Sequence, residues 1–292
     1  MSFAASAGAQ GNGQAVPGNP PAAPATGASQ GAAAAPAAKR PPQAKTQPEF
    51  DAYKTAMANT DPAAMEKASD DFAAKYPDSE IRILLYQNAM RLYQNANNAE
   101  KTEAMGRKML SLDEDNPEAL VIVAEVIAER TRASDIDRDQ RYGEAISMAQ
   151  KSIQTLETDL IVPPGTPQDK IDAYKAERRS QAYMIVGTID FKKEDYAAAQ
   201  ENLQKSIDAY PADPDPVVVL RLALTIDKQA TAAADRDKQE KLYAEALKVA
   251  NRAVELTQDN TVTGTTARNE RDRLQKLTPG AAPAQPQSPP KN

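Results

Sequence analysis

The chain has 292 residues and a formal net charge of −6, and it contains no Cys, His or Trp. This composition excludes disulfides, thiol nucleophiles, imidazole bases and the usual zinc and haem sites, and with them most familiar enzyme mechanisms. Residues 1–48 and 278–292 carry four cations and no acid, so the remainder has a charge of about −10. Such an acidic body neutralises phosphates poorly, and we expect no nucleic-acid partner.

The N-terminal segment, residues 1–47, consists mainly of Ala, Pro, Gly, Gln, Asn and Ser. It cannot bury enough apolar area to offset the entropy of ordering, so we expect a disordered tail that acts as a spacer. Residues 5–9 resemble a signal-peptide cleavage site whose apolar part has been lost upstream, and a plain disordered start is the alternative. No stretch reaches the roughly 18 apolar residues of a transmembrane segment.

Residues 48–277 have the apolar spacing of helices, and no stretch alternates as a strand does. Three helix starts are predicted where a capping side chain precedes a proline, at Asp61-Pro62, Asn116-Pro117 and Thr166-Pro167. The fold is therefore predicted to be all-α, followed by a second disordered Pro-rich tail over residues 278–292.

One helical pattern occurs three times, over residues 142–153, 196–207 and 243–254. Each copy begins with Tyr and carries Ala, Ser or another small residue at helical spacing, which lets a second helix approach closely. The segment before the second copy supplies a facing surface with Tyr183, Val186 and Gly187. Two antiparallel helices joined by a tight turn are therefore the predicted unit.

At these residues the sequence resembles the tetratricopeptide repeat (TPR), a 34-residue helix-turn-helix. Residues 180–213 match its pattern best, although Asp190 replaces the usual aromatic residue. The resemblance implies a right-handed α-solenoid of about five TPR-like repeats over residues 48–277, ending in a capping helix. The repeats are assigned to residues 48–79, 83–116, 117 onward, 180–213 and 214–259, and the capping helix to residues 261–277.

Two structural expectations follow from this assignment. Gly187 and Ala199 should face each other between the two helices of the fourth repeat. Residues 168–193 are predicted to form one helix about 39 Å long at 1.5 Å per residue. Its first three turns, with Tyr174 and Arg178, should project beyond the neighbouring repeats as a brace against the insertions or as a partner surface.

Two acidic patterns resemble parts of functional sites, one for calcium binding and one for acid-base catalysis. Residues 135–139 have the opening spacing of a calcium-binding loop, but Gln140 and Ile146 occupy the positions that require Gly and Glu, which favours a solvated loop. Glu125 and Glu129 lie one turn apart, but without a nucleophilic neighbour they indicate a negative patch rather than acid-base catalysis. We expect no metal and no cofactor.

In the TPR family, the first helix of each repeat lines a groove that binds peptides. The resemblance implies that the groove is lined here by Gln87, Arg91, Gln94, Asn95, Val121, Glu125, Ala128, Glu129, Met184, Thr188, Phe191, Lys192, Val218, Leu222 and Thr225. These residues lack the pattern of the family's carboxylate clamp. The alternative is that Met184, Phe191 and Leu222 pack inside the protein.

The sequence therefore predicts a non-enzymatic scaffold that binds a protein or peptide segment, and it is compatible with a homo-oligomer. Residues 72–79 resemble the end of the first repeat in periplasmic TPR proteins, so a bacterial envelope-assembly or cell-division accessory factor is the alternative. The predicted location is periplasmic or otherwise exported, with a cytoplasmic location as the alternative. An enzyme using carboxylate chemistry is the least favoured hypothesis.

Overall fold

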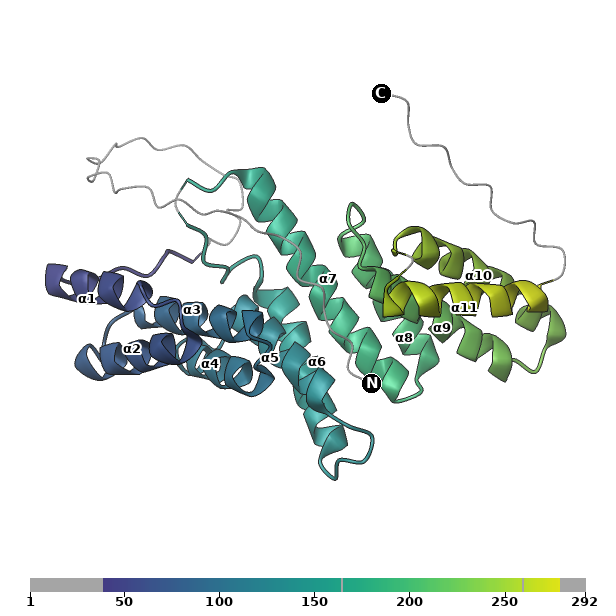
Figure 1. The fold of residues 1–292 in the computed structure, drawn as a ribbon, viewed down its shortest axis with the longest axis horizontal. Coiled ribbons are helices and arrows are strands. Elements are labelled where there is room, and N and C mark those ends of the chain that lie inside the picture. Colours follow the sequence, from purple (N-terminus) through teal and green to yellow (C-terminus); the bar gives the residue numbers. More distant parts are fainter. Residues whose placement is uncertain (1–38, 164, 259, 279–292) are drawn as a thin grey trace, which may run out of the picture. The chain divides into compact units, whose positions relative to one another are not determined.

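The computed structural model describes residues 39–163, 165–258 and 260–278, which form eleven α-helices and no strand (Figure 1). Ten of the helices form five successive pairs, and the eleventh follows them. The pairs are α1 (Gln47–Met57) and α2 (Pro62–Lys75), α3 (Arg82–Asn95) and α4 (Ala99–Leu112), α5 (Pro117–Arg130) and α6 (Arg138–Thr155), α7 (Gln168–Lys192) and α8 (Tyr196–Ala209), and α9 (Pro216–Ala232) and α10 (Arg236–Glu255), and the last helix is α11 (Val262–Leu277). The prediction of an all-α chain of helix pairs is confirmed.

Each helix packs against the next one along the chain, which is the nearest-neighbour arrangement of a helical-repeat solenoid. We call α1, α3, α5, α7 and α9 the first helices. Neighbouring first helices also contact each other, as α5 does with α7 and α7 with α9. Helix α11 packs on α10 and α9, so the predicted capping helix is confirmed.

Two of the three predicted helix starts have the predicted side-chain cap. Asp61 accepts a hydrogen bond from the Ala64 backbone N at 2.8 Å, and Asn116 accepts one from the Ala119 N at 3.0 Å. The third prediction is wrong, because α7 begins at Gln168 with Pro167 at its N-cap and without a side-chain cap. The Thr166 hydroxyl instead donates to the Pro163 carbonyl at 2.7 Å.

The core runs along the array as two hydrophobic clusters. One extends from Ala56 to Ile189 and the other from Leu203 to Leu274, and Met184 packs against both. The small residues of the three repeated patterns are buried, and most of them have no exposed surface. These residues are Ala145, Ala149 and Ser152 in the first pattern, Ala199 and Ser206 in the second, and Ala246, Ala250 and Ala253 in the third.

Close helix contact requires glycine on α7, but its neighbour differs from the predicted one. A Cβ atom at Gly187 would lie 2.8 Å from Leu203 Cγ and 3.0 Å from the Leu203 backbone N. Gly187 therefore faces Leu203, one helical turn beyond Ala199. The pattern located the contact between α7 and α8, and the side chain nearest to Gly187 in it is Leu203.

Residues 39–46, which the sequence analysis assigned to the N-terminal tail, contact the repeats through their backbone and side chains. The predicted disorder of residues 1–38 and 279–292 lies outside the described residues. Among the described helices, none is both long and apolar enough to cross a membrane.

Candidate functional site

The first helices carry polar side chains that bond from one repeat to the next, beginning between α3 and α5. Arg91 on α3 donates to Glu118 Oε1 through Nε at 3.1 Å and through Nη2 at 2.9 Å, and Gln87 donates to the other oxygen of the same carboxylate. Glu118 is 7% exposed, whereas Gln87 is half-buried and Arg91 is exposed. The structure therefore brings two predicted groove residues together on one buried carboxylate.

A second link joins α5 to α7. Gln181 Nε2 donates to Glu125 Oε2 at 2.7 Å. Burial raises the pKa of the Glu125 carboxyl to about 7, and the nearby negative charge of Glu129 acts in the same direction. Glu125 is thus a carboxyl whose proton is gained or lost near neutral pH.

The N-terminal half of α7 lies beside these groups from Tyr174 onward, whereas Gln168, Asp169 and Lys170 in its first turn are exposed. The Arg178 guanidinium lies over the Tyr174 ring at 4.8 Å from its centroid, and its Nη1 donates to Gln181 at 2.6 Å. Burial raises the pKa of Tyr174 to about 12, and the charge of Glu118 adds to the effect. Within the described chain, the buried Tyr174 hydroxyl and Arg178 Nε have no hydrogen-bond partner.

The same half of α7 is also tied to the loop between α6 and α7. Lys175 and Arg179 contact the two oxygens of Glu157 at 2.6 and 2.8 Å. These contacts act as the predicted brace, because they join α7 to the insertion that precedes it.

A third link joins α7 to α9. Arg221 Nη1 on α9 donates to the Thr188 hydroxyl on α7 at 2.7 Å, and burial lowers the pKa of the Arg221 guanidinium. Lys192 donates to the Ala128 carbonyl on α5 at 2.6 Å and lies over the Tyr142 ring. Both cations therefore belong to a surface shared by three successive first helices.

The predicted apolar end of the groove is not an open surface. Leu222 is 2% exposed and Thr225 is fully buried, because α9 packs there into the C-terminal hydrophobic cluster. The predicted accessibility of these two residues is therefore corrected. Met184 is half-buried between the two clusters, and Phe191 packs edge-on against Tyr196 with ring centroids 5.7 Å apart.

The remaining predicted positions divide between surface and interior. Gln94 is half-buried, whereas Asn95 and Glu129 are exposed. Val121, Ala128 and Val218, which were also assigned to the groove, are buried. The accessible part of the first-helix surface is therefore polar and extends from α3 to the contact between α7 and α9.

The acidic loop between α5 and α6 has a local structural role. Asp135 accepts a hydrogen bond from the Arg132 backbone N at 2.8 Å, and the Ile136 side chain is fully exposed. Over the described ranges, no group of three or more His, Cys, Asp or Glu side chains is arranged to hold a metal ion.

Comparisons with known proteins give no family for the chain. No protein-family model matches it, and no curated protein sequence matches it significantly. Three solved structures are similar to it over most of its length. A structure from the functional characterization of Pseudomonas aeruginosa pilF has 17% identity and a TM-score of 0.42, and the match covers 80% of this chain and 93% of that one.

The other two structures are a human IFIT1 dimer with m7Gppp-AAAA and the assembly chaperone of RpL4 (Acl4), residues 1–338. The first has 14% identity and a TM-score of 0.38, and the match covers 78% of this chain and 55% of that one. The second has 14% identity and a TM-score of 0.39, and the match covers 78% of this chain and 97% of that one. Similarity at this level carries no argument about function.

Proposed function

We propose that this chain is a non-enzymatic protein-interaction scaffold that holds an extended protein segment against its first helices. One observation carries the proposal: α3, α5, α7 and α9 are joined in sequence by side-chain hydrogen bonds, and several of the bonded side chains remain accessible. The result is a continuous polar surface instead of a single enclosed reaction site.

The mixture of groups on this surface favours a polypeptide as the ligand. Arg91 and Asn95 are exposed and offer N–H donors, while the exposed Asn95 and Glu129 offer oxygens. A protein backbone offers both donors and acceptors along its length, so it can pair with such a surface at several points. The acidic body, with a charge of about −10 outside the termini, disfavours a polyphosphate backbone.

Site-specific photo-cross-linking in the source cells tests the proposal. A photoreactive amino acid is placed at Asn95, Glu129 or Phe191 on the first helices of the full-length chain, and cross-linked partners are identified by mass spectrometry. We expect the same partner to be captured from all three positions, because an extended segment would span them.

The matched control places the same photoreactive residue at Gln204, Lys205 or Glu245, which are exposed on α8 and α10. These positions should capture little of that partner. Capture from α8 and α10 alone would contradict the proposal and would locate the interaction on the second helices.

We also propose an exported, envelope-associated location for the scaffold. Its support is the resemblance of residues 72–79 to periplasmic TPR proteins, together with the small-residue pattern of residues 5–9. Cell fractionation with an antibody against the native protein tests this location, and recovery in the cytoplasmic fraction alone would contradict it.

A further inference from the structure

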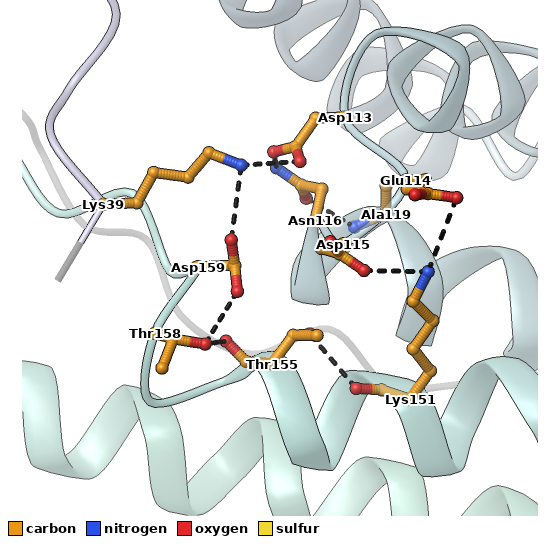
Figure 2. Close-up of polar contacts among 10 residues, drawn as sticks. All are labelled: Lys39, Asp113, Glu114, Asp115, Asn116, Ala119, Lys151, Thr155, Thr158 and Asp159. Carbon is orange, nitrogen blue, oxygen red and sulfur yellow. Dashed lines mark hydrogen bonds and ion pairs between the residues drawn. The ribbon is translucent and has the colours of Figure 1, made fainter. Parts of the chain in front are cut away.

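Residues 39–46, which we call the strap, lie across loops of the repeat array immediately before α1. The Lys39 backbone N donates to the Thr158 carbonyl at 2.9 Å. Its Nζ contacts Asp113 at 2.6 Å and Asp159 at 3.4 Å, between the two carboxylates (Figure 2). The strap is thus bound at its outer end by both backbone and charge.

The next residue makes a second charged contact. Arg40 binds Glu80 through two parallel bonds, with Nη1 at 2.8 Å from Oε2 and Nη2 at 2.6 Å from Oε1. This bidentate geometry is the most specific arrangement that Arg and a carboxylate adopt. The Gln43 backbone N also donates to Glu80, at 3.3 Å.

The acids that bind the strap come from three successive junctions between repeats. Glu80 lies between α2 and α3, Asp113 is the C-cap of α4 before α5, and Asp159 lies between α6 and α7. Two adjacent basic residues therefore contact loops that are up to 79 residues apart in the sequence. Pro41 and Pro42, which follow them, restrict the backbone and keep the strap extended.

Lys39, Arg40 and Pro42 of the strap form one wall of a cleft of about 450 Å³, and the repeats form the other. On the repeat side, Asp78, Glu80 and Asp113 contribute negative charge, Arg82 contributes one positive charge, and Ile83, Leu112 and Ile161 contribute apolar surface. We call this repeat side, on which Lys39 and Arg40 lie, the edge cleft. Extended segments are commonly recognised in this way, with charged groups giving orientation and apolar groups giving contact area.

The neighbouring acids are already paired within the repeats. Lys151 on α6 contacts Asp115 at 2.8 Å and Glu114 at 3.9 Å, as Figure 2 shows. Asp113, the remaining acid of this three-residue run, is directed at Lys39. Lys151 thus pairs with Asp115 and Glu114, and Lys39 pairs with Asp113. The contact of the strap is therefore specific, and it differs from a general attraction between a basic tail and an acidic surface.

The inner end of the strap is fixed in a different way. Glu49, which is 3% exposed, accepts hydrogen bonds from the backbone N of Lys45 and of Thr46 at 2.7 and 3.2 Å, and the Ser79 hydroxyl also donates to it. These bonds are part of the start of α1, whose N-cap is Thr46. Only the outer end therefore depends on partly exposed charge pairs, which salt screens.

We propose that the edge cleft is a docking site for an extended Lys-Arg segment, and that the chain's own Lys39 and Arg40 occupy it reversibly. The charge distribution of the sequence supports this assignment independently: Lys39, Arg40 and Lys45 are all the charged residues among the first 48, and all three lie in the strap. Docking places Lys39 beside Thr158 instead of beside α1. Release would free the cleft for a basic segment of a partner.

Limited proteolysis of the full-length chain tests the docking. Trypsin must take the Lys39 side chain into its own specificity pocket to cut the bond between Lys39 and Arg40, which is incompatible with the contacts to Asp113 and Asp159. The following bond precedes Pro41 and resists trypsin. In the double variant Glu80→Gln/Asp113→Asn, we expect this cleavage to become at least about fivefold faster at low salt, which corresponds to the loss of about 1 kcal/mol of docking free energy.

The matched control is Glu201→Gln/Asp208→Asn, which makes the same chemical changes at exposed positions of α8. Its cleavage rate should equal that of the wild type. Cleavage between Lys45 and Thr46, held by Glu49, serves as an internal reference and should not change in either variant. Equal rates for wild type and the cleft variant would overturn the proposal.

Two further measurements test which segment occupies the edge cleft. A labelled peptide with the sequence of residues 36–46 should bind the Lys39→Ala/Arg40→Ala chain at least about fivefold more tightly than the wild type, whose cleft is occupied. A peptide with Gln in place of Lys39 and Arg40 is the control. Equal binding to both chains, or none to either, would overturn the docking site.

The second measurement is the dependence of trypsin protection on protein concentration. Docking within one chain gives protection that is independent of concentration. Protection that increases with concentration, together with a dimer in sedimentation that the Lys39→Ala/Arg40→Ala variant loses, would overturn occupancy within one chain and assign the cleft to the strap of a second copy.

Discussion

At the scale of single residues, Glu125 should make stability depend on pH. Its folded-state pKa of about 7 lies above the ordinary value of 4.5, so the folded state favours the protonated carboxyl. The resulting penalty is absent below about pH 4.5, grows as the pH rises through the window from 4.5 to 7, and is complete above pH 7. Glu125→Gln removes the charge and keeps an oxygen that can accept from Gln181.

We therefore expect Glu125→Gln to gain about 2 to 3 kcal/mol of stability relative to wild type between pH 5 and pH 8. Urea unfolding at both pH values measures the difference. A stability difference that is the same at both would show that Glu125 ionises as an ordinary surface carboxyl does.

Two tyrosine hydroxyls provide a second prediction, because their surroundings differ. The Tyr174 hydroxyl is buried beside Arg178 and makes no hydrogen bond of normal geometry among the described residues, whereas the Tyr86 hydroxyl donates to Asp70 at 3.0 Å. Removing an unpaired buried hydroxyl costs little or stabilises, but removing a paired one loses the bond.

Tyr174→Phe should therefore be neutral or stabilising by up to about 1 kcal/mol, and Tyr86→Phe should destabilise by about 1 kcal/mol. The free energy of unfolding of the two variants in the same buffer gives the comparison. Equal destabilisation would mean that Tyr174 has a bonded partner, such as an ordered water.

Sequence analysis located only part of the candidate surface. It predicted Gln87, Arg91, Glu125 and Thr188 from repeat positions, but their bonding partners Glu118, Gln181 and Arg221 fall outside those positions. The position of a residue within its repeat indicates the direction in which its side chain leaves its own helix. It does not indicate which residue of the next helix a long Arg or Gln side chain reaches. Burial of Leu222 and Thr225 likewise depends on packing around α9, which repeat position alone does not encode.

At the scale of the helix, the caps of α5 and α7 offer a matched comparison. Asn116 is buried and caps α5, while Thr166 stands before a proline in the same way but caps no helix. Asn116→Ala should cost about 1 to 2 kcal/mol because it leaves the Ala119 N–H without its acceptor.

Thr166→Ala should change stability by less than about 0.5 kcal/mol, because it removes only a local loop bond. Thermal unfolding of both variants checks the pair. A large loss in Thr166→Ala would indicate that the start of α7 depends on this loop. The pair also explains the one wrong cap prediction: a capping residue before proline favours a helix start but does not determine it, and α7 begins at Gln168, two residues after Thr166.

At the scale of the whole molecule, the helix pairs were predictable because one pattern repeats and its small residues must be buried. The strap was not predictable, although it holds all the charged residues among the first 48, because a short basic cluster in a Pro-rich segment does not specify its own contacts. Its order depends on acids contributed by three distant junctions, which come together only when the repeats stack. Composition therefore wrongly assigned residues 39–46 to the disordered tail, because their contacts are a property of the assembled array.

Nearest-neighbour packing gives the last prediction, which concerns how far along the array a destabilising substitution acts. Leu274 on α11 and Leu85 on α3 are both fully buried, in different hydrophobic clusters. Each Leu→Ala change should cost about 2 to 5 kcal/mol at its own site. Because repeats contact mainly their neighbours, hydrogen exchange should accelerate in α10 and α11 for Leu274→Ala and in α2 to α4 for Leu85→Ala. Uniform acceleration along the chain in both variants would mean that the array unfolds as a single cooperative unit.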